Sequence, residues 1–249
     1  MMKDKVAVVT GGARDIGKAV SKKLASEGAK VVINYFDNKD QAVETLTEIK
    51  AEGGEAILVQ GDMTKQADID KLVHEAREAY GDEIHCLVNI AGGLVGRKTI
   101  EEMDEDFFNF VLRLNLTSTF LVTKAIVPYM PNGSSIVNFA SQAGRDGGGP
   151  GAVAYSTAKG AVMTFTRGLA KELGPKNIRV NALCPGMIST TFHDTFTKDE
   201  VRKNVAAGTP LRREGEAGEV ANLVACLASA ETSFVTGTNI DINGGLFFS

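Results

Sequence analysis

Short runs of apolar, mostly β-branched residues alternate with longer amphipathic stretches along most of this chain. The runs lie at residues 6–10, 31–34, 56–60, 86–89, 135–139, 179–183 and 239–242. Between the early runs, apolar residues recur three and four positions apart over residues 18–27, 40–52 and 69–80, which is the spacing of one helix face. The pattern therefore predicts seven strands with helices between them.

Nearly continuous apolar strands joined by helices are typical of a parallel sheet that is covered on both faces. We therefore predict an α/β fold: a doubly wound, seven-stranded parallel sheet with helices on both faces. No repeat, Pro/Ser-rich linker or charge run divides the 249 residues, so we expect a single domain over residues 1–249. Residues 145–151 form a glycine-rich loop, and residues 188–210 form a polar insertion with weak patterning.

Composition limits the partners of this protein. The chain has 27 Lys and Arg against 31 Asp and Glu, a net charge of −4, which gives no electrostatic reason to expect nucleic acid or anionic lipid. The first apolar run is too short for a signal-peptide core or a membrane span, so we expect a cytoplasmic protein with a small-molecule substrate. The cysteines and histidines show neither disulfide nor metal-ligand spacing, so we expect no metal site. They are Cys86, Cys184, Cys226, His74, His85 and His193.

A glycine-containing turn, TGGARDIG at residues 10–17, links the first strand to the first helix. Free N–H groups and the positive end of the helix attract a pyrophosphate there, and glycine lets it approach closely. A tight strand-to-helix turn with no ligand is the alternative, because the motif alone is weakly specific. The candidate cofactor contacts in the turn are Gly11, Arg14, Asp15, Ile16 and Gly17.

Further nucleotide signals follow the third and fourth strands, at the carboxyl edge of the sheet where ligands of such folds collect. Asp62 can accept a hydrogen bond from an adenine amino group, or it can cap the next helix near Thr64. Gly92 would let a cofactor pass close to the backbone. The candidates at this edge are Asp62, Met63, Asn89, Ala91 and Gly92.

The end of the second strand bears on the choice of cofactor. An acidic residue there would bind both ribose hydroxyls and exclude a 2′-phosphate, but the sequence has Asn34, Tyr35 and Phe36, and no acid until Asp37. Tyr35 is therefore a neutral candidate contact, and Arg14 lies near the expected phosphate. NADP(H) is favoured, while NAD(H) stays open because Asp15 can neutralise Arg14.

Candidate chemistry lies in the second half of the chain. Tyr155 and Lys159 are four residues apart in a strongly helical segment, so they share one face. A neighbouring ammonium stabilises phenolate, so Lys159 is expected to lower the pKa of Tyr155. Ser141 ends the fifth strand and can donate a hydrogen bond to a substrate oxygen. An exposed phenol beside a solvated lysine is the alternative for the Tyr–Lys pair alone.

Together, the phosphate turn, the strand-end serine and the Tyr–Lys helix resemble the short-chain dehydrogenase/reductase family over nearly the whole chain. The resemblance implies a Rossmann-type NAD(P)-binding domain and an NAD(P)(H)-dependent carbonyl reductase or alcohol dehydrogenase. In that family Tyr is the acid/base, Lys holds the nicotinamide ribose, Ser orients the carbonyl and Asn supports a proton relay. The matching residues here are Tyr155, Lys159, Ser141 and Asn115, the last of which, taken alone, can also be a solvent-facing polar residue of a helix.

The resemblance also implies a nicotinamide-side loop, with Pro185, Gly186, Ile188 and Thr190 as candidate contacts. A substrate lid would follow at about residues 188–210. His193 in this lid is a candidate substrate contact or a solvated loop histidine. Relatives pack their long helices between subunits, and the apolar stretches at residues 102–127, 152–173 and 246–248 fit a homotetramer or helices that meet only their own sheet.

Two positions depart from the family pattern. Asp15 and Ile90 stand where the family has glycine and asparagine. Asp tolerates left-handed backbone angles better than most residues, so the turn is expected to survive. The departure at Asp15 puts the phosphate contact and the cofactor preference in doubt, rather than the chemistry.

The substrate is expected to be a small polar carbonyl compound. The chain resembles bacterial 3-oxoacyl-[acyl-carrier-protein] reductases, but residues 129–134 lack the basic side chains that would hold an acidic carrier, and Lys176 is weak support. Arg145 can bind a carboxylate, and its loop resembles those of sugar and uronate reductases. It can equally pair with Asp146 or a neighbouring subunit.

We therefore expect reduction of a keto sugar or keto-uronate, such as 4-deoxy-L-erythro-5-hexoseulose uronate. A 3-oxoacyl-[acyl-carrier-protein] reductase is the alternative. A catalytically silent dinucleotide-binding regulator is disfavoured, because all four family catalytic residues are present.

Overall fold

A seven-stranded, all-parallel sheet forms the centre of the protein in the computed structural model, which describes residues 2–248. The strand order is β3-β2-β1-β4-β5-β6-β7, so the predicted fold class is confirmed. The strands are β1 (Val6–Thr10), β2 (Lys30–Tyr35), β3 (Glu55–Gln60), β4 (Cys86–Asn89), β5 (Ser135–Phe139), β6 (Arg179–Pro185) and β7 (Asn239–Ile242). All seven predicted runs form strands, and the differences at their ends are two residues or fewer.

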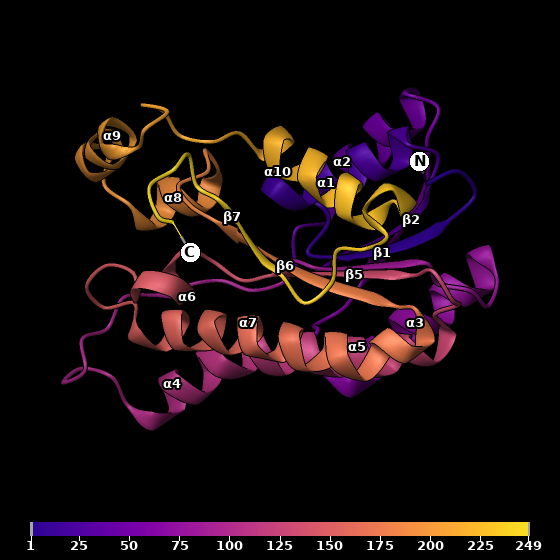
Figure 1. The fold of residues 1–249 in the computed structure, drawn as a ribbon, viewed down its shortest axis with the longest axis horizontal. Helices are drawn as coiled ribbons and strands as arrows, with labels where there is room; N and C mark the ends of the chain where they lie inside the picture. The colour runs from indigo at the N-terminus through magenta and orange to yellow at the C-terminus, as the bar shows by residue number, and fades with distance from the viewer. Residues whose placement is uncertain (1, 249) are drawn as a thin grey trace.

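Helices cover both faces of the sheet, with α1, α2 and α10 on one side and α3, α5 and α7 on the other (Figure 1). The α-helices of the first half are α1 (Asp15–Ser26), α2 (Lys39–Ala51), α3 (Gln66–Tyr80), α4 (Glu105–Leu112) and α5 (Ser118–Ile126). Those of the second half are α6 (Ala143–Asp146), α7 (Val153–Leu173), α8 (Thr191–Phe196), α9 (Asp199–Gly208) and α10 (Ala217–Ala228). The described residues also contain 3₁₀ turns at Val127–Tyr129, Gly174–Lys176 and Ala230–Thr232.

The side chains of β1 show how the two faces acquire their cores. Ala7 and Val9 belong to the cluster on the face of α1 and α10, whereas Val6 and Val8 belong to the cluster on the face of α3 and α5. Successive strand residues point to opposite faces, and each fully buried valine contributes about 1.5 to 3 kcal/mol. A strand that is apolar at every position is therefore needed to join both layers.

The long apolar helix expected at residues 102–127 differs in detail. It begins at Glu105, where the Asp104 carboxylate caps Phe107 N, and a π-helical turn, Arg113–Thr117, separates α4 from α5. By length and composition alone, the helical stretch Glu105–Tyr129 has the apolarity of a membrane span. In the fold its residues Val122 and Ile126 are buried against the sheet, and core helices of this kind pass the same test.

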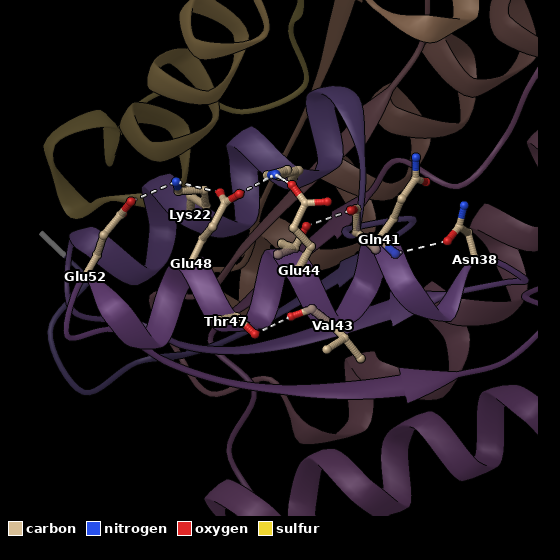
Figure 2. A network of polar contacts seen from close by, with 11 residues as sticks. Lys22, Asn38, Gln41, Val43, Glu44, Thr47, Glu48 and Glu52 are labelled. Atoms are coloured by element: carbon tan, nitrogen blue, oxygen red, sulfur yellow. Dashed lines mark hydrogen bonds and ion pairs between the residues drawn. The ribbon is translucent and has the colours of Figure 1, made fainter.

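A polar network holds α2 against α1 on the surface. Lys22 lies between Glu48 and Glu52, with N–O distances of 2.9 and 2.8 Å, and Lys18 bonds to Glu48 at 2.7 Å and to Glu44 at 2.9 Å (Figure 2). Hydrogen bonds from Lys18 and Lys22 lower the pKa of Glu48 to about 2. Individual surface pairs contribute little, but this network joins α2 to the helix that begins at the glycine-containing turn.

The region predicted as a weakly patterned lid contains two helices, α8 and α9, which lie beside the carboxyl edge of the sheet (Figure 1). They have six and ten residues. Helices this short show few repeats of the apolar spacing, so the sequence pattern does not reveal them.

Candidate active site

A cavity of about 920 Å³ opens at the carboxyl edge of the sheet. It lies where the strand order reverses between β1 and β4, the usual ligand position of open α/β sheets. One part, which we call the nucleotide end, is lined by residues 11, 13–17, 34–38, 41 and 61–64. Ser141, Tyr155 and the lid residues Phe192 and His193 line the other, which we call the substrate end.

The glycines of the nucleotide turn are required by close backbone contacts. Gly11 has φ +63°, and a Cβ there would lie 3.2 Å from the backbone of Ala91. A Cβ on Gly17 would lie 2.0 Å from the carbonyl oxygen of Gly11, closer than any real contact. Asp15 takes a left-handed conformation, φ +50°, as expected for an aspartate that replaces glycine. These constraints leave the turn open to a ligand instead of filled by side chains.

Buried polar side chains fix the backbone of this turn. The Oδ1 atom of Asn34 accepts from Gly11 N at 3.2 Å, and its Nδ2 donates to Gly61 O at 3.0 Å. Thr45 Oγ1 donates to Ala13 O at 2.8 Å. Sequence reasoning treated Asn34 only as the absence of an acid and missed this role, although a polar residue inside an apolar strand is a signal for it.

The segment after β4 is held in a similar way. Thr10 Oγ1 accepts from the amides of Ile90 and Ala91, each at 3.1 Å. Ile90, Ala91 and Gly92 line the cavity. Asn89 does not: its amide nitrogen donates to Asn138 and Thr123 inside the protein. The expected contact between the Asn89 side chain and a cofactor is therefore not supported.

Asp62 and Met63 line the nucleotide end, as expected. The Asp62 carboxylate accepts from Thr64 N at 2.9 Å and from Thr64 Oγ1 at 2.7 Å. The alternative of a local hydrogen-bonding role for Asp62 near Thr64 is therefore present: Oδ1 accepts both bonds, in the turn before α3. Tyr35, Arg14 and Ile16 also line this end.

Tyr155 and Lys159 lie on the same face of α7 and both line the cavity. The Nζ atom of Lys159 is 5.7 Å from the centre of the Tyr155 ring, and it donates to Phe139 O at 2.7 Å. Burial lowers the pKa of Lys159 to about 8. The ammonium is therefore the predominant form at neutral pH and titrates just above it.

The pKa of Tyr155 differs from the sequence-based expectation. Burial raises it, and a hydrogen bond with the Ser141 hydroxyl lowers it less than burial raises it. Lys159 does not lower this pKa as expected, because its ammonium bonds to the Phe139 carbonyl instead of the phenol. At neutral pH Tyr155 thus carries its proton, which is the state needed to protonate a carbonyl oxygen.

Asn115 occupies the π-helical turn and is fully buried. Its Oδ1 accepts from Gly93 N at 3.0 Å, and its Nδ2 donates to Gly93 O at 2.9 Å. A Cβ on Gly92 would lie 2.6 Å from Asn115 Oδ1 and 3.4 Å from Lys159 Nζ. The solvent-facing alternative for Asn115 is therefore wrong: this side chain braces the backbone beside Lys159 from behind the cavity wall. π-turns are frequent at functional sites.

The predicted nicotinamide-side loop also lies at the cavity. Pro185, Gly186, Ile188 and Thr190 line it. A Cβ on Gly186 would lie 2.7 Å from the Asn243 side chain, so a larger residue would push the loop away from β7. The contact of these four residues with a nicotinamide stays a prediction.

Arg145 lies elsewhere than expected. Its Nε atom bonds to Asp241 Oδ1 at 3.0 Å and its Nη2 to Asn239 O at 2.5 Å, and it does not line the cavity. The predicted contact between Arg145 and a substrate carboxylate is therefore corrected. Its partner is an acid on β7 that is 96 residues away in sequence, which no local pattern indicates.

The first helix of the predicted lid, α8, contributes aromatic side chains to the substrate end. The ring centre of Phe192 is 6.2 Å from that of Tyr155 and 5.1 Å from that of His193. His193 lines the cavity, its Nδ1 lies 3.0 Å from Thr197 Oγ1, and burial lowers its pKa. It is therefore a neutral, partly enclosed residue and not a solvated one.

One contact joins the lid to the nucleotide turn. The Asp15 carboxylate accepts from Thr191 N at 3.0 Å and from Thr191 Oγ1 at 2.5 Å. The Arg14 guanidinium lies 4.0 Å from the same carboxylate and is 67% exposed. Asp15 is thus mainly engaged with the lid, and Arg14 is left accessible.

These features fit a nicotinamide dinucleotide. The turn at Gly11 and Gly17 has no room for side chains, and the N-cap residue of α1, Arg14, makes no side-chain cap hydrogen bond to the first amides of the helix. A side chain at position 92 would crowd Asn115 and Lys159. Such a cradle matches a pyrophosphate and an adjoining ribose. The Ser141, Tyr155 and Lys159 side chains lie at the opposite part of the same cavity.

Comparison with known proteins gives a consistent result. A family model described as enoyl-(acyl carrier protein) reductase matches residues 11–247. The uncharacterized oxidoreductase YhdF of Bacillus subtilis is 35% identical over 248 residues, covering 100% of this chain and 85% of its own. A short-chain dehydrogenase/reductase from Serratia marcescens superposes with a TM-score of 0.93 at 31% identity, covering 98% of both chains. A blue fluorescent protein from a metagenomic library, solved in complex with NADPH, gives 0.92 at 31% identity and the same coverage.

Proposed function

The chain belongs to the short-chain dehydrogenase/reductase family and is an NAD(P)-dependent oxidoreductase, and we propose that it reduces a small polar carbonyl compound. The substrate class is a keto sugar or keto-uronate, of which 4-deoxy-L-erythro-5-hexoseulose uronate is an example. The observation that carries the proposal is that Ser141, Tyr155 and Lys159 line the same cavity as the nucleotide turn, with the pKa of Tyr155 raised by burial, so that its phenol keeps the proton. A cavity lined by apolar and a few convergent polar groups is the usual form of a small-molecule site.

The residues of the substrate end have separate roles in carbonyl reduction. A bound nicotinamide dinucleotide supplies the hydride. Ser141 donates a hydrogen bond to the carbonyl oxygen, where negative charge develops. Tyr155 transfers its phenolic proton to that oxygen. Lys159, whose counterpart in the family holds the nicotinamide ribose, supplies a buried ammonium beside Gly92, and Asn115 holds the 92–93 backbone in place there.

Replacement of the phenol tests this assignment. Tyr155→Phe removes the transferable proton and keeps the ring, so we expect a loss of kcat of roughly 10²- to 10⁴-fold. Tyr80→Phe, at the opposite edge of the molecule near Lys30, is the matched control and should retain wild-type rates. Initial rates of NADPH or NADH oxidation measure both. Unchanged turnover in Tyr155→Phe would contradict the assignment of Tyr155 as the acid.

NADP(H) is the proposed cofactor, with NAD(H) as the alternative. The end of β2 offers no carboxylate before Asp37, and the exposed Arg14 guanidinium lies beside the same end of the cavity. Asp15 bonds to Thr191, which leaves Arg14 with one loose contact at 4.0 Å. Dissociation constants for NADPH and NADH, measured for wild type and Arg14→Ala, test the preference: loss of Arg14 should weaken NADPH binding alone.

A 3-oxoacyl thioester reductase is the second candidate, because the chain resembles 3-oxoacyl-[acyl-carrier-protein] reductases and the matching family model is described by a reductase whose substrate is also bound to acyl carrier protein. Against it, the segment before β5 offers no cluster of basic side chains for an acidic carrier. A panel of keto sugars, keto acids and an oxoacyl thioester separates the two. A silent dinucleotide-binding regulator is a remote third possibility, which any steady turnover in this panel would exclude.

We also propose that the protein is a cytoplasmic homotetramer. Phe110, Phe120 and Val153, on α4, α5 and α7, are exposed, and these helices lie in one layer (Figure 1). An apolar helix layer of this kind fits an interface between subunits. Size-exclusion chromatography with light scattering tests the assembly, and a monomeric mass would contradict it.

A further inference from the structure

We propose that Arg97 forms an anion subsite at the substrate end and selects carbonyl compounds that carry a carboxylate. The inference rests on the proposed carbonyl reduction and deepens it, because it names the group that recognises the substrate. Arg145, the residue expected for this task, is bonded to Asp241 outside the cavity. A carboxylate therefore needs another partner, and the lining of the cavity contains one.

Arg97 lies in the segment between β4 and α4 and lines the cavity together with His193 and Phe192. Its side chain passes over the loop that follows Ser141: a Cβ on Gly151 would lie 2.9 Å from Arg97 Cβ, and a Cβ on Gly149 would lie 3.5 Å from its Nη1. The guanidinium thus lies between the loop and the lid. This is the part of the cavity that also contains Tyr155.

The Arg97 guanidinium has no acidic partner among residues 2–248. Nη1 donates to Pro150 O at 2.9 Å and Nε approaches Phe196 O at 3.4 Å. Both acceptors are neutral carbonyls, and the Nη2 edge makes no bond within the described chain. Arg202 differs, because its guanidinium is bonded to Glu214 and Asp194. Arg97 is exposed and lines the cavity, so its charge faces the substrate end without an acidic partner among the described residues.

The two carbonyl contacts restrict the orientation of this side chain. They come from separate elements, the loop after α6 and the carboxyl end of α8, so the guanidinium plane is held while the Nη2 edge stays available. A guanidinium pre-oriented in this way loses less conformational entropy on binding. Its planar fork matches the two oxygens of a carboxylate.

The other charged groups near the substrate end do not compete for this role. Asp146 accepts from Gln142 Nε2 and Gly148 N, so its carboxylate keeps its charge but is held within its own loop, and no ion pair joins it to Arg97 within the described residues. Burial, followed by the charge of Arg202, lowers the pKa of His193, and Arg97 also contributes to this lowering. His193 is therefore neutral at pH 7, and Lys159 is bonded to Phe139 O. Arg97 supplies the positive charge for an anionic substrate group.

Binding to the NADPH-loaded protein tests the subsite without requiring turnover. Galacturonate and its methyl ester share one skeleton and differ by the carboxylate charge, and calorimetry gives the affinity of each. We expect wild type to bind the acid at least tenfold more tightly than the ester. Arg97→Gln should abolish this difference, and Arg97→Lys should retain part of it. A difference that persists in Arg97→Gln would overturn the proposal.

Steady-state rates separate specificity from a positioning role. With a keto-uronate as substrate, Arg97→Gln should raise KM roughly 10- to 100-fold, while the corresponding ester should change less than about threefold. Lys98→Gln removes an adjacent charge that is paired with Asp104 and serves as the matched control. An equal loss on acid and ester would mean that Arg97 only positions the lid. If neither compound reacts in wild type while the acid still binds through Arg97, the proposed reaction fails and the subsite stands.

Discussion

The two ends of the cavity are built in different ways. At the nucleotide end, glycines and short buried side chains such as Asn34 and Thr10 fix the backbone through hydrogen bonds inside the protein. At the substrate end, long side chains such as Arg97 and a short helix, α8, make contacts across loops. The first end is a preformed cradle, whereas the second is assembled from side-chain contacts between separate loops and helices. We therefore expect cofactor binding to depend on the fixed backbone of the turn, and substrate specificity to depend on the orientation of a few long side chains.

Gly17→Ala should disrupt the backbone of the nucleotide turn and give the largest loss of cofactor affinity. The new Cβ would lie 2.0 Å from Gly11 O, so the turn must shift, and we expect NADPH affinity to fall more than about 100-fold because such a clash cannot relax locally. Gly218→Ala, on α10, is the control, because its Cβ meets nothing within 4 Å and the residue does not line the cavity. Fluorescence titration with NADPH measures both variants. Near-normal affinity in Gly17→Ala would show that the cradle is more adaptable than the contacts indicate.

The pH dependence of reduction should report on the substrate end. Lys159 has a pKa of about 8, lowered by burial, and burial also raises the pKa of Tyr155. Both groups are protonated below pH 8, which is the active state for reduction. As pH rises above about 8, Lys159 loses its charge and kcat/KM should fall toward tenfold per pH unit. A rate that stays flat to pH 9.5 would exclude this role of Lys159.

The same contrast explains what the sequence can predict. The nucleotide turn is recognisable because its constraints, a left-handed angle and a close approach, act within a few residues of Gly11. Tyr155 and Lys159 are recognisable because a helix fixes their spacing. The orientation of Arg145 depends on Asp241, 96 residues away, and the importance of Arg97 depends on carbonyls of two other segments. Long-range partners of this kind leave no local pattern.

Asn34→Leu should weaken the cradle through stability as well as binding. The substitution leaves Gly11 N and Gly61 O without their partners, and each unsatisfied buried group costs about 1 to 3 kcal/mol. We expect the free energy of unfolding to fall by about 2 to 3 kcal/mol. Urea denaturation measures it, and Asn38→Ala, at the exposed cap of α2, should lose only about 1 kcal/mol. A loss at Asn34 no larger than at Asn38 would contradict its role.

Asp15→Gly should give the smallest effect, but it tests the comparison most directly. Within residues 2–248, Asp15 is the residue of the nucleotide end whose side chain bonds to the lid. Glycine takes the φ of +50° without strain, so stability should stay within about 1 kcal/mol of wild type. The two hydrogen bonds to Thr191 would be lost, and hydrogen exchange of residues 190–197 should quicken roughly two- to tenfold.

Thr191→Val separates the two bonds at this junction, because it removes the hydroxyl and keeps the backbone amide. It should therefore produce part of the effect of Asp15→Gly, and the double variant should add little to Asp15→Gly alone, as expected for groups that share one interaction. If exchange in the lid is unchanged in Asp15→Gly, while NADPH affinity changes, Asp15 acts on the nucleotide only. If exchange quickens and substrate KM rises with NADPH affinity intact, the carboxylate serves the lid, and the two ends are coupled through a residue of the nucleotide turn.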